Sequence, residues 1–330
     1  MSDQDQPETN TDNSRRDFIK GAGVIAAGAG LAAATGGAAF AQGTAAQPKP
    51  GEFNPNGRFK DQVILITGAT SGIGEGTAKA FALEGGKVFF NGRRANLGQK
   101  VQDEIRAFGG EATFMQSDVR HEDQIKAFID AAVAKYGRID AAFNNAGVVF
   151  GNGKIADRAP LADVNAADFD DIWNTNSRGL FLSMKYEIKA MLKNKPRGRA
   201  GLRGAIINNS SVSAHGAFAG IAPYSVSKHG VLGLTRAAAT DHGADGIRVV
   251  SISPGGVDTP MRRAAVEALG LNPDDAPTPN IEYRTNDVAE MADVVMFLAS
   301  PDAPSSIQGT DIDVTMGMLT GPLTPAKTEG

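Results

Sequence analysis

The chain has 330 residues, and 33 basic against 37 acidic side chains give it a net charge of −4. This balance argues against nucleic acid as a partner, because binding a phosphate backbone requires an excess of positive charge. A hydrophobic content of 42% with 21% charged residues is typical of a globular chain, and the absence of cysteine excludes disulfide bonds, thiol nucleophiles and zinc–thiolate sites.

The first 41 residues form a segment of their own. Arg15 and Arg16 precede an uncharged, weakly apolar run over residues 21–41 that is rich in alanine and glycine. The run ends in Ala-Phe-Ala, the small-x-small pattern that precedes signal-peptidase cleavage. This order of features resembles a bacterial twin-arginine export signal, so we expect a signal peptide over residues 1–41, cleavage after Ala41, membrane contact only during export, and a periplasmic protein. The alternative is a polar tail with an accidental arginine pair on a cytoplasmic protein.

Apolar runs alternate with helical spacing in the rest of the chain. A continuous apolar run at 63–66, typical of a strand buried on both faces of a sheet, leads through a glycine-rich turn into a helix. This alternation predicts an α/β fold with one doubly wound parallel sheet of Rossmann type and helices on both faces. We expect a proline-containing linker over 42–57 and a single catalytic domain over 58–330. Further strands are expected at 87–91, 112–116, 141–144, 205–208, 248–253 and 311–315, and helices at 124–136, 169–192 and 225–242.

The turn after the first strand contains Gly68, Gly72 and Gly74. In a strand–turn–helix unit, free backbone N–H groups and the positive end of the helix dipole favour a pyrophosphate at such a turn. We expect Gly68 to allow the tight turn, Gly72 to let the backbone approach the phosphates, and Gly74 to let the helix pack closely on the strand. The alternative is an ordinary strand–helix turn without a ligand.

Further motifs follow the glycine turn in order along the chain. They are Asn144-Asn145-Ala146-Gly147 after the fourth strand, Asn176 in a long helical stretch, a Ser211…Tyr224-x-x-x-Lys228 array, Pro254-Gly255 after the sixth strand, and Thr259-Pro260-Met261. Together with the spacing Thr-Gly-x-x-x-Gly-x-Gly, they resemble the short-chain dehydrogenase/reductase family over roughly residues 60–317. The resemblance implies an NAD(P)-dependent enzyme that acts on a small carbonyl or alcohol substrate.

The residues of the Ser…Tyr-x-x-x-Lys array suit acid–base chemistry. Tyr224 and Lys228 lie four residues apart and therefore share one face of a helix. A tyrosine ordinarily titrates near pH ~10, too high for a general base at neutral pH, so we expect the neighbouring ammonium and an oxidised nicotinamide to lower the pKa of Tyr224. The resemblance makes Tyr224 the general acid/base and brings Lys228 to the nicotinamide ribose. Ser211 would donate a hydrogen bond to the substrate oxygen, and Asn176 would hold a water that passes protons towards Lys228.

The predicted cofactor is NADP in preference to NAD. An NAD-selective site usually places a carboxylate at the end of the second strand, but Gly92 stands there and Arg93 follows it. A guanidinium suits a 2′-phosphate, although a site that accepts either cofactor is the alternative. By the resemblance Asp118 meets the adenine ring; a role as helix N-cap is the alternative.

The predicted site residues fall into two groups. The catalytic group is Asn176, Ser211, Tyr224 and Lys228. The cofactor-binding group lies at the carboxyl ends of the strands: Thr67, Gly68, Ser71, Gly72, Ile73, Gly74, Arg93, Arg94, Asp118, Val119, Asn145, Ala146, Gly147, Tyr224, Lys228, Pro254, Gly255, Val257 and Thr259.

Other expectations are less tied to motifs. No metal site is predicted, because the histidines show no metal-ligand spacing, and His215 is expected on a loop that flanks the substrate. The family commonly forms dimers or tetramers, so we expect a homo-oligomer, with the homotetramer as our prediction. Thr315-Met316-Gly317 departs from the Asp-Gly-Gly often found there, which puts the local turn in question.

Two rival functions stay open at this point. One is a nucleotide-binding sensor or scaffold without turnover, and the other is an epimerase or dehydratase without net redox change. Export of a nucleotide enzyme raises a further hypothesis, that the folded protein carries its nucleotide out of the cytoplasm and retains it through many turnovers.

Overall fold

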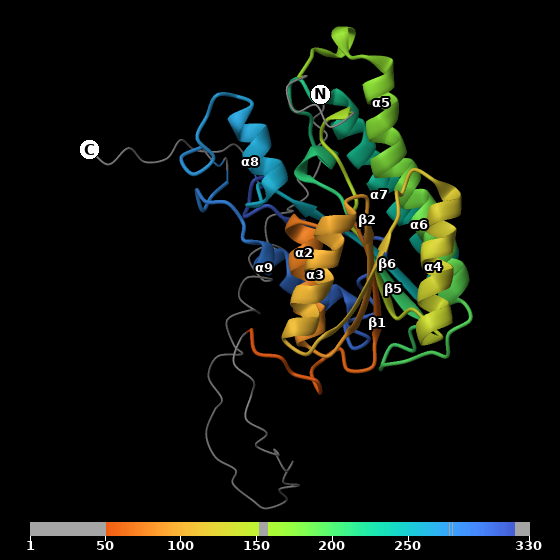
Figure 1. The fold of residues 1–330 in the computed structure, drawn as a ribbon. Helices are drawn as coiled ribbons and strands as arrows, with labels where there is room; N and C mark the ends of the chain where they lie inside the picture. Colours follow the sequence, from red (N-terminus) through yellow and green to blue (C-terminus); the bar gives the residue numbers. More distant parts are fainter. Residues whose placement is uncertain (1–50, 152–157, 277, 279, 321–330) are drawn as a thin grey trace, which may run out of the picture. The chain divides into compact units, whose positions relative to one another are not determined.

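The computed structural model describes residues 51–151, 158–276, 278 and 280–320. A seven-stranded, all-parallel sheet with the order β3-β2-β1-β4-β5-β6-β7 forms its centre (Figure 1). The predicted doubly wound α/β fold is therefore confirmed. The strands are β1 (Val63–Thr67), β2 (Lys87–Gly92), β3 (Glu111–Gln116), β4 (Ala141–Asn144), β5 (Gly204–Asn209), β6 (Ile247–Pro254) and β7 (Asp311–Val314).

Helices cover both faces of the sheet (Figure 1). One face carries α2 (Gly72–Leu83), α3 (Ala95–Ala107) and α9 (Val288–Ala299), and the other carries α4 (Glu122–Tyr136), α6 (Gly179–Met191) and α7 (Ala222–His242). Every residue of β1 and β6 is buried, as expected for strands covered on both sides. Two apolar clusters, one on each face, therefore hold the sheet between the helical layers.

One predicted helix is interrupted. The stretch expected as a single helix over 169–192 contains α5 (Ala166–Trp173), a π-helical turn over Asn174–Arg178, and then α6. A π turn keeps the chain helical but widens it by one residue, and such turns are frequent at functional sites. The remaining regular elements are α8 (Pro260–Glu267) and the short 3₁₀ turns Leu161–Asp163 and Val212–Ala214.

The segment before residue 58 packs against the domain where it is described. Phe53 lies beside Phe108 with ring centroids 6.1 Å apart, and the Asn54 amide donates to the Leu83 carbonyl at 2.7 Å. Phe53 and Asn54, which fall in the predicted linker, thus contact the domain that follows. The predicted signal peptide lies outside the described residues.

The chain after β7 bends back towards the segment that follows α8. Met316 has φ +54° and Gly317 φ +75°, and the Ile281 amide donates to the Met316 carbonyl at 3.1 Å. Met316 thus adopts the left-handed conformation that glycine adopts more readily, at the position where the sequence departs from Asp-Gly-Gly. None of the helices in the described part of the chain has the length and hydropathy of a membrane span.

Candidate active site

The predicted site residues gather at the carboxyl ends of the central strands. Chain order reverses between β1 and β4, and a crevice at such a switch point is where ligands bind open parallel sheets. The glycine turn follows β1, the Asn145 segment follows β4, and the catalytic array begins just after β5.

The glycine turn has the conformation that a pyrophosphate requires. Gly68 and Gly72 have φ +69° and +58°, a region that side-chain-bearing residues rarely adopt. A Cβ on Gly74 would lie 2.5 Å from Asn145 Nδ2 and 2.6 Å from the Gly68 carbonyl oxygen, so only glycine fits there. Ser71 is the N-cap of α2, and its side chain makes no capping hydrogen bond. An uncapped helix N-terminus inside a closely packed glycine turn fits the pyrophosphate of a dinucleotide.

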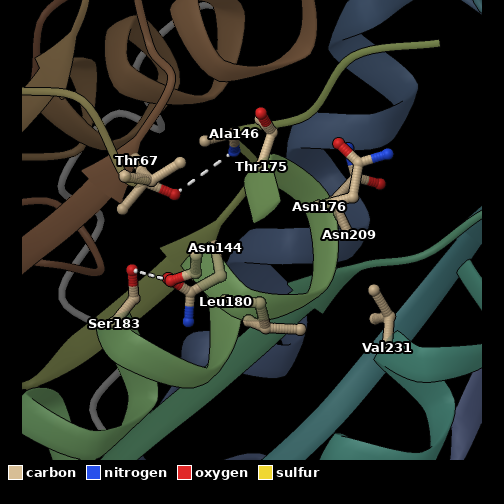
Figure 2. A pocket seen from close by; sticks show the side chains of 11 residues that line it. Thr67, Asn144, Ala146, Thr175, Asn176, Leu180, Ser183, Asn209 and Val231 are labelled. Atoms are coloured by element: carbon tan, nitrogen blue, oxygen red, sulfur yellow. Dashed lines mark hydrogen bonds between the residues drawn. The ribbon is translucent and has the colours of Figure 1, made fainter. Parts of the chain in front are cut away.

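Two asparagines hold this turn from neighbouring strands. Asn91 at the end of β2 accepts from the Gly68 amide through Oδ1 at 3.1 Å and from the Ala69 amide through its carbonyl at 3.0 Å. Asn145 donates through Nδ2 to the Gly68 carbonyl at 3.0 Å. Thr67 accepts from the backbone amides of Asn145 and Ala146 at 3.1 and 3.2 Å, the second of which is drawn in Figure 2. Asn91 was not among the predicted residues. A polar asparagine directly after the apolar run of this strand is the sequence feature that could have indicated it.

Tyr224 and Lys228 lie on the first turns of α7. Lys228 is buried, and its Nζ donates to the Asn209 carbonyl at 2.7 Å and lies 5.6 Å from the centroid of the Tyr224 ring. A Cβ on Gly147 would lie 3.6 Å from Lys228 Nζ. The Lys228 ammonium therefore lies next to the segment that follows β4. The i, i+4 spacing has therefore placed both groups on one face, as expected.

Ser211 lies opposite Tyr224, just beyond β5. Its side chain caps the turn Val212–Ala214 by accepting from the Ser213 amide at 3.1 Å, and it also hydrogen-bonds to Tyr224. The capping bond fixes the position of Oγ, while the hydroxyl hydrogen stays available to an acceptor.

Asn176 sits in the π-helical turn and clamps two segments of the site. Its Oδ1 accepts from the Val148 amide at 2.8 Å, and its Nδ2 donates to the Val148 carbonyl at 2.8 Å and to Ser227 Oγ at 3.0 Å. The side chain thus joins the chain after β4 to the residue before Lys228. An internal cavity of about 10 Å³ lies beside it, lined by Thr67, Asn144, Thr175, Asn176, Asn209 and other residues labelled in Figure 2. That volume has room for about one water molecule.

Burial dominates the protonation of the catalytic pair. It raises the pKa of Tyr224, an effect that the hydrogen bond with Ser211 only partly opposes, and it lowers the pKa of Lys228 to about 8. The protein alone therefore does not lower the pKa of Tyr224 as the sequence suggested. The Lys228 ammonium donates to the Asn209 carbonyl on β5 and lies over the Tyr224 ring.

The two arginines after β2 have different surroundings. Arg94 reaches back over the glycine turn and donates to Thr70 Oγ1 at 3.0 Å and to Ser71 Oγ at 2.7 Å. Arg93 is exposed, and its backbone carbonyl accepts from Gln116 Nε2 at 2.9 Å. Arg94 therefore stabilises the turn, and Arg93 keeps its guanidinium at the surface beside it.

Asp118 is held by an ion pair. Burial alone would raise the pKa of its carboxyl, but two hydrogen bonds and the charge of Arg120 lower it instead. The residue that caps α4 is His121, so the alternative prediction of a helix N-cap for Asp118 is wrong. Its Oδ1 instead accepts from the Arg120 amide at 3.0 Å, which tightens the turn before that helix.

The remaining predicted cofactor residues lie beside the glycine turn or follow the neighbouring strands. Thr259 caps α8 and approaches the glycine turn, since a Cβ on Gly72 would lie 3.2 Å from Thr259 Cγ2. Ile73 packs on the core beside this turn, and Val119 contacts Gly179 at the start of α6. Others close the end of β6 and the chain after it: Pro254, Gly255 and Val257, the last bridged to Asn286.

His215 hydrogen-bonds within the protein. Its Nε2 lies 2.7 Å from Asp311 Oδ2 and 3.2 Å from Ser253 Oγ, which ties the loop after Ser211 to strands β6 and β7. Within the residues that the structure describes, no group of three or more His, Asp or Glu side chains could hold a metal ion.

Known proteins resemble this chain over most of its length. Residues 62–270 match the family model described as short chain dehydrogenase, and residues 12–32 match the twin-arginine translocation pathway signal sequence. An A-factor type gamma-butyrolactone 1′-reductase of Streptomyces virginiae is 38% identical over 267 residues, covering 79% of this chain and 96% of the relative. The crystal structure of levodione reductase superposes with a TM-score of 0.73 at 32% identity, covering 80% of this chain and 100% of that one. A variant of actinorhodin polyketide ketoreductase, crystallised with NADPH, superposes with a TM-score of 0.70 at 30% identity over 81% of this chain and 98% of that one.

Proposed function

Since the chain belongs to the short-chain dehydrogenase family, we propose that it transfers a hydride between a nicotinamide dinucleotide and a small carbonyl or secondary alcohol substrate. One observation carries the proposal: Tyr224, Lys228 and Ser211 meet beside a glycine turn shaped for a pyrophosphate. A nucleotide-binding sensor has no need of a hydroxyl pair and a buried lysine next to the nicotinamide end of such a site.

Each catalytic side chain has one task in this proposal. The Tyr224 hydroxyl gives a proton to the substrate oxygen during carbonyl reduction and takes it back during alcohol oxidation. Ser211 donates a hydrogen bond to the same oxygen and stabilises the charge that develops on it. When bound, the nicotinamide supplies or accepts the hydride. The Lys228 ammonium would bind the ribose hydroxyls of the dinucleotide, and the positive charge of the oxidised nicotinamide would favour the phenolate over the neutral phenol.

Protons reach Tyr224 through the interior of the protein in this scheme. The Asn176 turn borders a cavity with room for one water, and Asn176 contacts Ser227, the neighbour of Lys228. A water held in this region would connect Lys228 to the π-helical turn, so that the lysine can be reprotonated during repeated turnover.

Steady-state turnover tests the proposed activity. Purified mature protein should oxidise NADPH or NADH in the presence of members of a ketone panel, which should include levodione because of the related reductase. Nucleotide binding without turnover on any ketone or alcohol would favour a sensor. Conversion without net change in nucleotide absorbance would favour an epimerase or dehydratase.

NADP is the proposed cofactor, and Arg93 is its proposed selector. Arg93→Ala should weaken NADP binding about tenfold and leave NAD binding nearly unchanged, because only NADP carries the 2′-phosphate that a guanidinium can contact. Arg94→Ala is the matched control: it removes the hydrogen bonds to Thr70 and Ser71 and should weaken both cofactors. Titration of each variant with both nucleotides measures the effect. Equal losses for the two cofactors in the Arg93 variant would contradict this assignment.

The export signal and the nucleotide site together favour a retained cofactor in the periplasm. Twin-arginine export moves folded proteins, so the nucleotide can be bound before translocation and then recycled in place by a second substrate. We expect protein purified from the periplasm to release close to one nucleotide per chain on denaturation and to follow ping-pong kinetics. Nucleotide-free protein that requires added NAD(P)H would contradict retention.

A homotetramer is the proposed assembly. Trp173, Phe181 and Val226, on α5, α6 and α7, are 38%, 47% and 45% exposed, and they offer apolar surface to another copy of the chain.

A further inference from the structure

A carboxyl group that the proposed reaction does not use is buried beneath the site. Glu187 lies on α6 with 0% of its surface exposed, on the face of the helix that packs against β4 and β5. Its Oε2 accepts from Asn144 Nδ2 at 2.9 Å, and its Oε1 has no hydrogen-bond partner. Within the described chain no cationic side chain pairs with it, and only burial and Asn144 act on its pKa.

Asn144 extends this contact into a buried chain of amides. Its Nδ2 also donates to Asn208 Oδ1 at 3.2 Å, and Asn208 Nδ2 donates to Thr235 Oγ1 at 2.9 Å. All of these side chains are buried, and Asn144 and Asn208 are register partners in β4 and β5. The chain therefore runs from α6 through two strands to α7, two turns beyond Lys228.

Two buried oxygen atoms without hydrogen-bond partners indicate where a proton would fit. Glu187 Oε1 and Asn144 Oδ1 are both buried without partners, and both belong to the residue pair that already shares one hydrogen bond. A carboxylate and an amide oxygen can only accept, so an ionised Glu187 leaves both atoms unpaired. One proton on Oε1 turns one of them into a donor and gives the pair two parallel hydrogen bonds.

We propose that Glu187 is a protonated carboxylic acid in the folded protein, that it donates from Oε1 to Asn144 Oδ1, and that this pair positions the nucleotide turn through β4. An ionised carboxylate in this place would be strongly unfavourable, because no positive charge compensates it. Burial raises the pKa of Glu187 to about 8, only partly opposed by the Asn144 hydrogen bond.

The charged groups on the surrounding elements are engaged elsewhere. On α6 itself, Lys185 and Tyr186 bond to Glu122 of α4, and Lys189 lies over the Tyr186 ring. On α7, Lys228 donates to a backbone carbonyl of β5. None of these groups supplies a charge to Glu187.

The pair can reach the nucleotide turn through adjacent residues. Asn145 follows Asn144 directly, and its backbone and side chain hold Thr67 and Gly68. Asn209 follows Asn208, donates to Asn145 Oδ1 at 3.0 Å, and accepts from Lys228 through its carbonyl. This positioning role rests on the proposed nucleotide function, whereas the protonation of Glu187 does not.

Infrared spectroscopy tests the protonation directly. At pH 7 the wild-type protein should show the carbonyl stretch of a protonated carboxylic acid, and the Glu187→Gln variant should lack that band. A spectrum without this band, or a band that the substitution leaves in place, would overturn the assignment.

Stability against pH gives an independent test. The unfolded chain loses this proton near its ordinary pKa of 4.5 and the folded chain near 8, so the group's contribution to stability is complete below pH 4.5 and is lost as pH rises to 8. Glu187→Gln keeps both hydrogen bonds without a titrating proton. Its Tm should equal that of the wild type near pH 5 and exceed it by about 5 °C or more at pH 8. A Tm difference between the two proteins that stays the same at pH 5 and pH 8 would show that Glu187 does not lose a proton over this range and would contradict the proposal.

Nucleotide affinity tests the positioning role separately. Glu187→Leu removes the hydrogen bonding between Glu187 and Asn144, leaves the Asn144 amide only its bond to Asn208, and should raise the Kd for NADPH several-fold, whereas Glu187→Gln should restore wild-type binding. If both variants bind NADPH like the wild type while the infrared band behaves as expected, the acid is present and the positioning role is refuted. If no protein of the series binds nucleotide, the proposed function fails and the protonation result stands.

Discussion

Replacement of Tyr224 by phenylalanine should lower kcat about 10³-fold or more and leave the Kd for NADPH within about twofold of the wild type. The phenylalanine ring keeps the packing of α7 and the contact with Lys228, so the loss is confined to the hydroxyl. That hydroxyl is the proposed proton donor and acceptor, and its hydrogen bond with Ser211 positions it beside the substrate oxygen. Initial rates with a saturating ketone, together with nucleotide titration, separate the two effects.

A matched control is available on the neighbouring helix. Tyr186 also lies on a helix and donates its hydroxyl to Glu122 at 2.9 Å, outside the crevice. Tyr186→Phe should leave kcat unchanged, because it removes a surface hydrogen bond only. A Tyr224→Phe enzyme with near-normal kcat would show that another group moves the proton.

Much of the scaffold follows from patterns that act over short distances in the sequence. The continuous apolar runs mark strands because both faces of a central parallel strand are covered by helices, as β1 and β6 show. The glycine turn was predictable because a positive φ at Gly68 and Gly72 is a local property of the chain. The shared face of Tyr224 and Lys228 follows from helical spacing alone.

Features that depend on distant partners could not be predicted. The π turn around Asn176 is stabilised by bonds to Val148 and Ser227, which lie 28 and 51 residues away, and its sequence has ordinary helical spacing. Glu187 looks like a surface residue in sequence, since Lys185 and Lys189 flank it, yet its side chain turns inward to Asn144, 43 residues away.

The protonation of Tyr224 also depends on more than the local sequence. Spacing places Lys228 next to Tyr224 and suggests a lowered tyrosine pKa. Burial instead raises the pKa of Tyr224 and lowers that of Lys228. Burial depends on residues that are distant in the sequence, so local spacing does not predict it. We therefore expect formation of the phenolate to depend on the positive charge that an oxidised nicotinamide would bring.

Replacement of Gly74 by alanine should weaken dinucleotide binding about 100-fold or more. The added Cβ would meet Asn145 Nδ2 at 2.5 Å, the Gly68 carbonyl oxygen at 2.6 Å and the Ala69 Cα at 2.9 Å. Two of these atoms belong to the backbone of the turn, and the third, Asn145 Nδ2, donates to the Gly68 carbonyl. None of them can move aside as the end of a flexible side chain could. The start of α2 must move away from β1, which carries the first-turn N–H groups away from the pyrophosphate position.

Gly233→Ala provides the control for the general effect of the substitution. Gly233 lies within α7, and a Cβ there would meet no atom within 4 Å, so alanine should bind NADPH normally and stabilise the helix by up to about 1 kcal/mol. Isothermal titration of both variants, with circular dichroism to verify folding, measures the contrast. A folded Gly74→Ala protein that binds NADPH as tightly as the Gly233→Ala protein would mean that the dinucleotide does not bind at this turn. The crevice between β1 and β4 would then lose its role as the cofactor site, and Tyr224 and Lys228 their place beside a nicotinamide.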